Sequence, residues 1–237
     1  PARWPPNHDA TLRASCLQRR IMIWRPLQAG VQALGLDLSS AQQQSLLDFL
    51  DLLQKWNKVY NLTAVRNPQE MLTHHLLDSL AAVPALQRHL ATQPGAARLL
   101  DVGCGGGLPG VVFAICCPQL TVHCVDTVAK KAAFIQQAAA SLHLPNLTGI
   151  HARVESLTGP YAVVSSRAFA ALADFTAWSR PALAADGVWL AMKGKQPDDE
   201  IAALDAQIAQ VFHVEPLTVP GLDAQRCIVW LRPVRAA

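Results

Sequence analysis

Residues 99–110, with the sequence LLDVGCGGGLPG, decide the fold of this chain. An apolar run ending in a carboxylate, then a glycine-rich loop and a proline, is typical of a strand, a turn and a helix start. Gly103, Gly105 and Gly107 permit a positive φ and leave no Cβ between the backbone and a ligand. Pro109 suits the first turn of a helix, where its missing N–H costs nothing. A small ligand can therefore contact bare backbone at this loop.

The glycine spacing leaves two ligands open. The string from Gly105 to Gly110, G-x-G-x-x-G, also fits the fingerprint of dinucleotide-binding proteins, so the loop can serve NAD or S-adenosylmethionine. Asp101 favours S-adenosylmethionine, because a carboxylate beside the loop attracts the cationic amino group of its methionine part and repels a pyrophosphate. Asp126 ends the next predicted strand and can accept both ribose hydroxyls of either ligand. The alternative for Asp126 is a simple helix N-cap.

From residue 98 onward, short β-rich runs alternate with helical patterns. This alternation predicts right-handed βαβ units and an α/β fold whose parallel sheet is covered on both faces. The last two strands have no room for a crossover helix between them, so they should form an antiparallel hairpin. Five parallel strands followed by a hairpin is the Rossmann-like layout of class I S-adenosylmethionine-dependent methyltransferases. The predicted strands are 99–102, 122–126, 147–151, 162–165, 188–192, 213–219 and 226–232, and the helices are 109–117, 127–143, 169–180 and 198–210.

The part before the sheet has a helical pattern. Apolar residues recur at intervals of three and four from residue 46 to residue 60, and Ser40 with Gln43 predicts a capping box. A second helical pattern begins at Pro68 and is interrupted at Pro84. We therefore expect an N-terminal helical extension in front of the sheet.

We expect three consecutive regions in the chain. Residues 1–26 are predicted to be a disordered extension, with Met22 as an alternative start of translation. Residues 27–92 form an N-terminal helical cap, and residues 93–237 form the domain that binds S-adenosylmethionine.

Composition indicates a globular cytoplasmic protein without a membrane partner. The 237 residues are 51% hydrophobic, but no apolar run approaches the 18 residues of a membrane span. The six cysteines include no CxxC pair, which favours reduced buried thiols over a disulfide or metal framework. The formal net charge is +3, and residues 1–25 alone contribute five arginines and one aspartate. Because the rest of the chain is nearly neutral, any contact with nucleic acid must come from local patches.

Four motifs together resemble the RsmG (GidB) family of bacterial 16S rRNA guanine-N7 methyltransferases. They are KWNKVYNLT at 55–63, HLLDS at 75–79, DVGCGGGLPG at 101–110 and SRAFA at 166–170. The resemblance runs in order and spacing from about Leu27 to Val229 and is more specific than the glycine loop alone. It implies a class I fold with a helical cap and transfer of a methyl group from S-adenosylmethionine to N7 of one guanine. The implied partner is 16S rRNA, free or in a small-subunit assembly intermediate, bound by a monomer.

The resemblance also assigns residues around the cofactor. Gly103 and Leu108 look like the family's loop residues that contact S-adenosylmethionine, and Val154 with Glu155 resembles the pair beside the adenine. Arg167 matches an arginine that lines the cofactor site. With the residues argued above, the predicted cofactor-binding set is Asp101, Gly103, Gly105, Leu108, Asp126, Val154, Glu155 and Arg167. Cys104 stands where threonine or serine is common, which can alter a loop hydrogen bond without moving the site.

The expected chemistry needs no general base. Guanine N7 has an in-plane lone pair and no proton to lose, so methyl transfer requires only alignment and exclusion of water. No catalytic residue is therefore assigned, and Arg167 and Lys193 are candidates for positioning. Arg167 can fork onto the cofactor's carboxylate or an RNA phosphate, with a surface cation as the alternative. Lys193 can neutralise phosphate or can be a solvated loop charge.

Candidate RNA-binding residues lie in both parts of the chain: Lys55, Lys58, Arg66, Phe169 and Lys193. Lys55 and Lys58 share one predicted helix face and form a patch with Arg66. Phe169 can stack on a guanine swung out of its helix, and core packing is the alternative. No metal is expected, because adjacent histidines such as His74-His75 point about 100° apart on a helix.

Three other functions remain open from the sequence. A methyltransferase for a small molecule is compatible with the nearly neutral domain. An NAD-dependent oxidoreductase is disfavoured by Asp101 and by the lack of a Tyr-x-x-x-Lys pair. A module that binds S-adenosylmethionine or RNA without turnover is the third. RNA-dependent, salt-sensitive binding separates an rRNA enzyme from the small-molecule enzyme.

Overall fold

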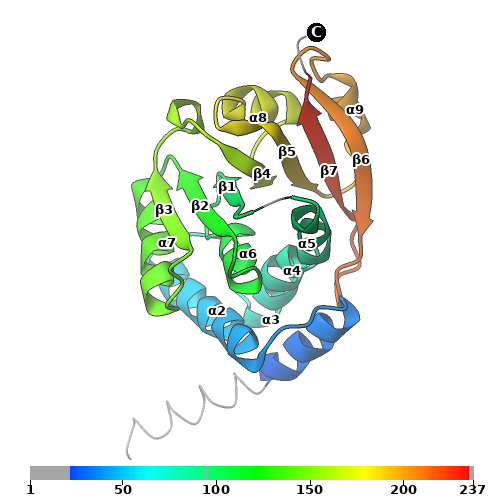
Figure 1. Cartoon of the computed structure of the whole chain (residues 1–237). Helices are drawn as coiled ribbons and strands as arrows, with labels where there is room; N and C mark the ends of the chain where they lie inside the picture. Colours follow the sequence, from blue (N-terminus) through cyan, green and yellow to red (C-terminus); the bar gives the residue numbers. More distant parts are fainter. Residues whose placement is uncertain (1–21, 94, 235–237) are drawn as a thin grey trace, which may run out of the picture.

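The computed structural model describes residues 22–93 and 95–234, which fold as a central sheet flanked by helices (Figure 1). Within these residues the sheet has seven strands in the order β3-β2-β1-β4-β5-β7-β6. The first five strands are parallel, and β7 is antiparallel to both β5 and β6. The α/β layout predicted from the sequence, five parallel strands and a terminal hairpin, is confirmed. The strands are β1 Arg98–Val102, β2 Thr121–Asp126, β3 Leu147–His151, β4 Tyr161–Arg167, β5 Leu183–Lys193, β6 Ala209–Leu217 and β7 Arg226–Pro233.

Helices cover both faces of the sheet. Buried strand residues alternate between two clusters: Leu99 packs with the N-terminal helices, α6 and α7, whereas Leu100 packs with α8. This alternation follows from the two-residue period of a strand. The helical segments are α2 Ser40–Tyr60, α3 Pro68–Met71, the π-helix η1 Leu72–Leu77, α4 Asp78–Leu80, α5 Val83–Ala91, α6 Gly110–Cys116, α7 Ala129–Ser141, the 3-10 helix η2 Val154–Ser156, α8 Leu172–Ser179 and α9 Asp198–Ala202.

Two local predictions are corrected by the structure. The helix expected over 198–210 ends at Ala202, because residues from Ala209 onward pair with β7 along the whole of β6. The capping box of α2 uses Ser39 rather than Ser40: the Gln42 amide donates to Ser39 Oγ at 3.2 Å, and the Ser39 amide donates to Gln42 Oε1 at 3.0 Å. The capping-box error is a shift of one residue, whereas the helix after β5 is much shorter than predicted.

The helical part begins earlier than the sequence suggested. Residues 22–33 are helical and Ile23 is only 4% exposed, so residues 22–26 do not belong to a disordered extension. The reason is that Ile23 and Leu27 are one helical turn apart and both enter the core. The rest of the expected extension, residues 1–21, lies outside the described residues.

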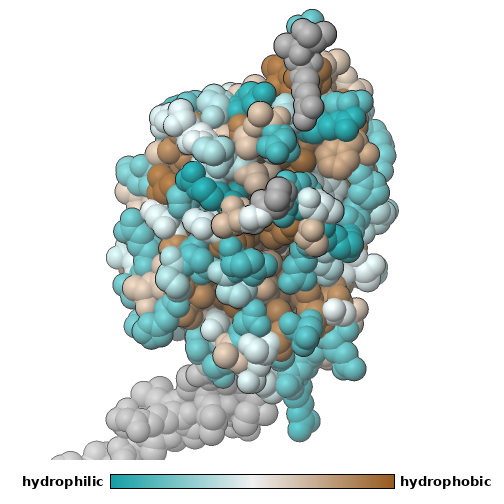
Figure 2. Space-filling model, in the orientation of Figure 1, coloured by the Kyte–Doolittle hydropathy of each residue, from teal (hydrophilic) through white to brown (hydrophobic). Residues whose placement is uncertain are grey.

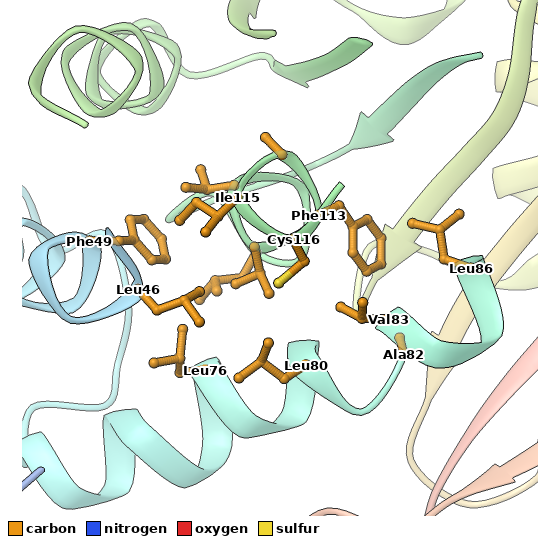
Figure 3. Packing of buried hydrophobic residues seen from close by; sticks show 14 of the residues in the cluster. Leu46, Phe49, Leu76, Leu80, Ala82, Val83, Leu86, Phe113, Ile115 and Cys116 are labelled. Atoms are coloured by element: carbon orange, nitrogen blue, oxygen red, sulfur yellow. The ribbon is translucent and has the colours of Figure 1, made fainter. Parts of the chain in front are cut away.

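The helical part and the sheet share one hydrophobic core. Figure 3 shows side chains of α2, η1, α4 and α5 converging on α6, the helix that follows the glycine loop. Leu46 of α2, Leu76 of η1 and Leu80 of α4 are fully buried there and belong to the same hydrophobic cluster as Phe113 of α6. Residues 27–92 therefore have no separate core of their own, and the glycine loop is held between the two parts.

The face of the molecule in Figure 2 carries hydrophilic side chains over most of its area, with apolar side chains scattered between them. Among the described helices, none is long and apolar enough to cross a membrane.

We expect Leu80→Ala to lower the free energy of unfolding by about 2–5 kcal/mol, because the substitution leaves a cavity where α4 meets α6. Urea denaturation followed by both circular dichroism and tryptophan fluorescence is the measurement, and both probes should report one shared transition. Val59→Ala is the control, since Val59 is 69% exposed on α2 and its truncation should change little. Two separate transitions would show that the helical part and the sheet unfold independently.

Candidate functional site

The glycine loop is anchored at its far end by Asp101. The Gly110 amide donates to Asp101 Oδ2 at 2.9 Å, and the Ser165 hydroxyl donates to Asp101 Oδ1 at 2.9 Å. A Cβ at residue 110 would overlap Cys124 Sγ and lie 2.8 Å from Asp101 Oδ2, so only glycine fits there. Asp101 is completely buried and lines none of the pockets described below. Because its side chain is buried away from both pockets, the structure places Asp101 behind the loop as a support, and not at the pocket wall where the sequence predicted a ligand contact.

Burial raises the pKa of Asp101 from 3.8 to about 7, although the Ser165 hydroxyl and the Gly110 amide oppose the shift. Because the folded protein then holds the proton more tightly than the unfolded chain, stability should fall as pH rises through this window.

Asp101→Asn cannot titrate, and its side-chain oxygen can accept the Gly110 amide while its Nδ2 donates to the Ser165 hydroxyl oxygen. We therefore expect the unfolding free energy of the wild type, relative to this variant, to fall by about 2–3 kcal/mol between pH 5 and pH 8. Denaturation of both proteins across this range measures the difference. A difference that does not change with pH would show that Asp101 stays ionised in the fold.

The first pocket lies where β1, β2 and β3 end, and we call it the Asp126 pocket. It has a volume of about 470 Å³. The Gly105 amide donates to Asp126 Oδ2 at 3.1 Å, and the Val128 amide donates to Oδ1 at 2.9 Å, while Lys131 Nζ lies 3.5 Å away. Asp126 is thus not the N-cap of α7, which is Val128. Its carboxylate instead holds the glycine loop against the start of that helix.

The wall opposite the loop is formed by η2 and by the segment after β4. Val154 is buried and Glu155 is exposed, and both line the Asp126 pocket. The backbone amide of Glu155, and then its bond to Arg153, hold the pKa of Glu155 below its ordinary value.

Phe169 belongs to the Asp126 pocket and not to the second pocket described below. Its ring lies edge-on to Phe175 and to Trp178, with centroids 6.4 Å and 6.0 Å apart. It also covers Gly103, where an added Cβ would overlap the ring. The ring is therefore partly packed and partly open to the pocket, and Trp178, 40% exposed, stands beside it.

The second pocket lies on the other side of the glycine loop, between the loop and the helical part. We call it the Arg167 pocket, and its volume is about 510 Å³. Gly105 and Leu108 line it, and Gly103 and Ala168 line both pockets. Ala168 has a φ of +50°, a left-handed conformation that few non-glycine residues adopt. The two pockets therefore meet at a backbone without a Cβ and at a strained turn.

An ion-pair network joins three distant parts of the chain in the Arg167 pocket. Asp78, only 3% exposed, accepts from Arg167 Nη1 at 2.9 Å and from Arg226 Nε at 2.7 Å. Arg167 Nη1 also donates to the His74 carbonyl at 3.0 Å. The end of β4, the start of β7 and the helical part are thereby fixed to one another.

His75 lies beside this network as a neutral group. Its Nε2 is 2.7 Å from Thr63 Oγ1, and burial, followed by the charge of Arg167, lowers its pKa to about 4. Thr63 is placed by Asn57, whose side-chain oxygen accepts the Thr63 amide at 2.8 Å. The motif at 55–63 thus positions one hydroxyl at the pocket wall.

Lys193 is not a solvated loop charge. Its Nζ donates to the Ala170 carbonyl at 2.9 Å and to Glu200 at 2.7 Å, and the side chain lines the Arg167 pocket. Lys58 and Arg66 come together at a separate hollow of about 580 Å³ beside α2, whereas Lys55 is exposed and does not line it.

Four residues of these pockets were missed as site residues in the sequence: Thr63, Asp78, Trp178 and Arg226. Thr63 and Asp78 lie within the motifs at 55–63 and 75–79 that carry the family resemblance, so these motifs could have identified them as site residues. Arg226 and Trp178 come from the terminal hairpin and from α8, and no local pattern distinguishes them from surface residues.

Comparisons with known proteins show the family and the fold of this chain. A model of the family described as rRNA small subunit methyltransferase G (GidB) matches residues 42–229. The proteins named ribosomal RNA small subunit methyltransferase G from Acidovorax sp. (strain JS42) and Acidovorax ebreus (strain TPSY) are 76% and 77% identical, each over 88% of this chain and 94% of the relative. The structure of the glycopeptide N-methyltransferase MtfA, complexed with S-adenosylmethionine, shares the fold at 11% identity and a TM-score of 0.52. That similarity covers 65% of this chain and 94% of MtfA.

Proposed function

The chain belongs to the rRNA small subunit methyltransferase G (GidB) family, and we propose that it transfers a methyl group from S-adenosylmethionine to N7 of one guanine in 16S rRNA. One observation supports this most directly. The Asp126 pocket, which holds two acidic and two basic side chains, and the cationic Arg167 pocket meet at Gly103, where no Cβ separates them. Such a junction lets a group held in one pocket reach a group held in the other.

The Asp126 pocket fits the adenosine part of the cofactor. Asp126 lines the pocket, and each of its oxygens accepts one backbone amide, Oδ2 from Gly105 of the loop and Oδ1 from Val128 before α7, so each oxygen can accept a ribose hydroxyl as well. We assign Val154 and Glu155 to the adenine, and Gly103, Gly105 and Leu108 to the methionine part. Asp101 supports the site by holding the loop and makes no contact of its own. When bound, S-adenosylmethionine supplies an electrophilic methyl group on its sulfonium.

The Arg167 pocket fits a base with an unprotonated nitrogen. Guanine N7 already carries its lone pair, so the protein needs to orient the base and exclude water rather than remove a proton. The ionisable residues of the pocket agree with this: His75 is neutral, and both Arg167 and Lys193 are engaged in ion pairs. We therefore assign Arg167 and Lys193 to positioning.

The RNA extends beyond the pocket in this proposal. Lys55, Lys58 and Arg66 lie on or beside α2 and are assigned to phosphates outside the target nucleotide. We propose that a monomer acts in the cytoplasm on a small-subunit assembly intermediate, in which the target guanine is accessible. Phe169 faces the other pocket, so we assign it to the cofactor side and not to the guanine.

The test is methyl transfer from labelled S-adenosylmethionine to 16S rRNA that lacks the modification, followed by nuclease digestion and mass spectrometry of the nucleosides. The expected product is 7-methylguanosine. Binding of S-adenosylmethionine without labelling of RNA would favour a small-molecule methyltransferase or a module without turnover. A different labelled nucleoside would overturn the assignment of the Arg167 pocket to guanine N7.

A further inference from the structure

We infer that Arg167 and Arg226, held side by side by Asp78, form a binding site for one oxyanion, and that this oxyanion is a phosphate of the RNA. The inference rests on the proposed function. It adds one residue, Arg226, and a contact between the arginines of the Arg167 pocket and an RNA phosphate.

The two arginines are arranged around one buried carboxylate. The Asp78 side chain is 5% exposed, whereas the side chains of Arg167 and Arg226 are 19% and 25% exposed. The carboxylate therefore lies beneath the two guanidinium groups, and these groups face the pocket. Each binds a different oxygen of Asp78, which keeps two like charges close together.

Several N–H donors of this pair have no partner among the described residues. Arg167 uses only Nη1, for His74 and Asp78, which leaves its Nε and Nη2. Arg226 uses Nε for Asp78 and Nη1 for the Gln225 carbonyl, which leaves Nη2. Guanidinium groups satisfy such donors best with oxyanions, because their fork matches two oxygens at once.

The charge of the pocket also favours an anion. The Asp78 carboxylate neutralises one of the two arginines, so the three side chains together keep a charge of +1. Lys193 is balanced by Glu200, and His75 is uncharged at neutral pH because of its lowered pKa. Both arginines therefore share the single carboxylate of Asp78, and the remaining positive charge lies on their guanidinium groups.

Two oxyanions are chemically possible: the carboxylate of the cofactor's methionine part and a phosphate of the RNA backbone. Both can reach this pocket, because Gly105 and Leu108, which we assign to the methionine part, line it together with Arg226. We assign the oxyanion to the RNA because the Arg226 side chain, 25% exposed, is more open to solvent than that of Arg167, at 19%. This partial exposure makes Arg226 reachable by a large ligand.

Arg226→Gln separates the two sources. We measure the affinity for S-adenosylmethionine by calorimetry and the affinity for a 16S rRNA fragment by filter binding at several salt concentrations. The expected result is unchanged cofactor affinity and about tenfold weaker RNA binding. The slope of log K against log salt should shrink by about 0.7–0.9, the contribution of one phosphate contact. Arg226→Lys should restore the slope but only part of the affinity.

Arg232→Gln is the matched control. Arg232 lies on the same strand, about 20 Å away by strand length, and donates to Gln210. Its loss should leave both affinities unchanged. If Arg226→Gln weakens cofactor binding instead of RNA binding, the oxyanion is the methionine carboxylate and the RNA assignment is overturned. If neither affinity changes, there is no oxyanion site.

Asp78→Asn tests the positioning role of the carboxylate. If only net charge mattered, removing an acid from the pocket would strengthen RNA binding. Because Asp78 holds the arginines together, we expect about fivefold weaker RNA binding in a folded variant, as checked by circular dichroism. Stronger binding would overturn the positioning role. Neither binding measurement depends on turnover. Failure of the proposed methyl transfer would appear separately, in the labelled-methyl assay with the wild type.

Discussion

We expect Asp126→Ala to bind S-adenosylmethionine at least about 100-fold more weakly than the wild type and to lose methyl transfer in proportion. Hydrogen bonds to a charged acceptor contribute about 1.5–3 kcal/mol each, and the ribose has two hydroxyls to donate. The substitution also removes the acceptor of the Gly105 amide, so the loop loses its tie to β2. Isothermal titration calorimetry of both proteins is the measurement.

Asp126→Asn is the matched control for this prediction. Its amide oxygen can still accept one backbone N–H, so the loop keeps part of its support while the charge is lost. An intermediate affinity is expected. Unchanged affinity in Asp126→Ala would remove this residue from the cofactor site and reassign the pocket.

The second large effect is expected for Gly103→Ala. Gly103 has a φ of +65°, and an added Cβ would overlap the ring of Phe169. The left-handed conformation costs an alanine about 1–2 kcal/mol, and the displaced ring enters the junction of the two pockets. We expect the affinity for S-adenosylmethionine and the rate of methyl transfer to fall by about 100-fold, measured by calorimetry and by the labelled-methyl assay.

Gly35→Ala separates backbone strain from blockage of the junction. Gly35 has nearly the same φ, +64°, but nothing lies within 4 Å of an added Cβ. We expect this variant to lose about 1 kcal/mol of stability and to keep full cofactor affinity. Equal loss of affinity in both variants would mean that strain alone, and not the ring of Phe169, explains the effect.

Most residues that we propose for the cofactor side could be named from the chain alone. Gly103 directly follows β1, Asp126 ends β2 and Val154 lies three residues after β3, and the ends of parallel strands meet at one edge of a sheet. Asp101 shows the limit of this reasoning, because its position beside the loop suggested a ligand contact. In the fold its oxygens are taken by Gly110 and Ser165, and Ser165 lies 64 residues away along the chain.

The α/β class, the sheet with its terminal hairpin and the glycine loop follow from the sequence alone, because these depend on local periodicity and on backbone freedom at glycine. Which charged side chains meet depends on how distant segments pack. Asp78, Arg167 and Arg226 come from a helical segment and from strands β4 and β7, and no local pattern relates them. Their distances and burial depend on how the helical part packs on α6, which is set by the shared core and not by any single segment.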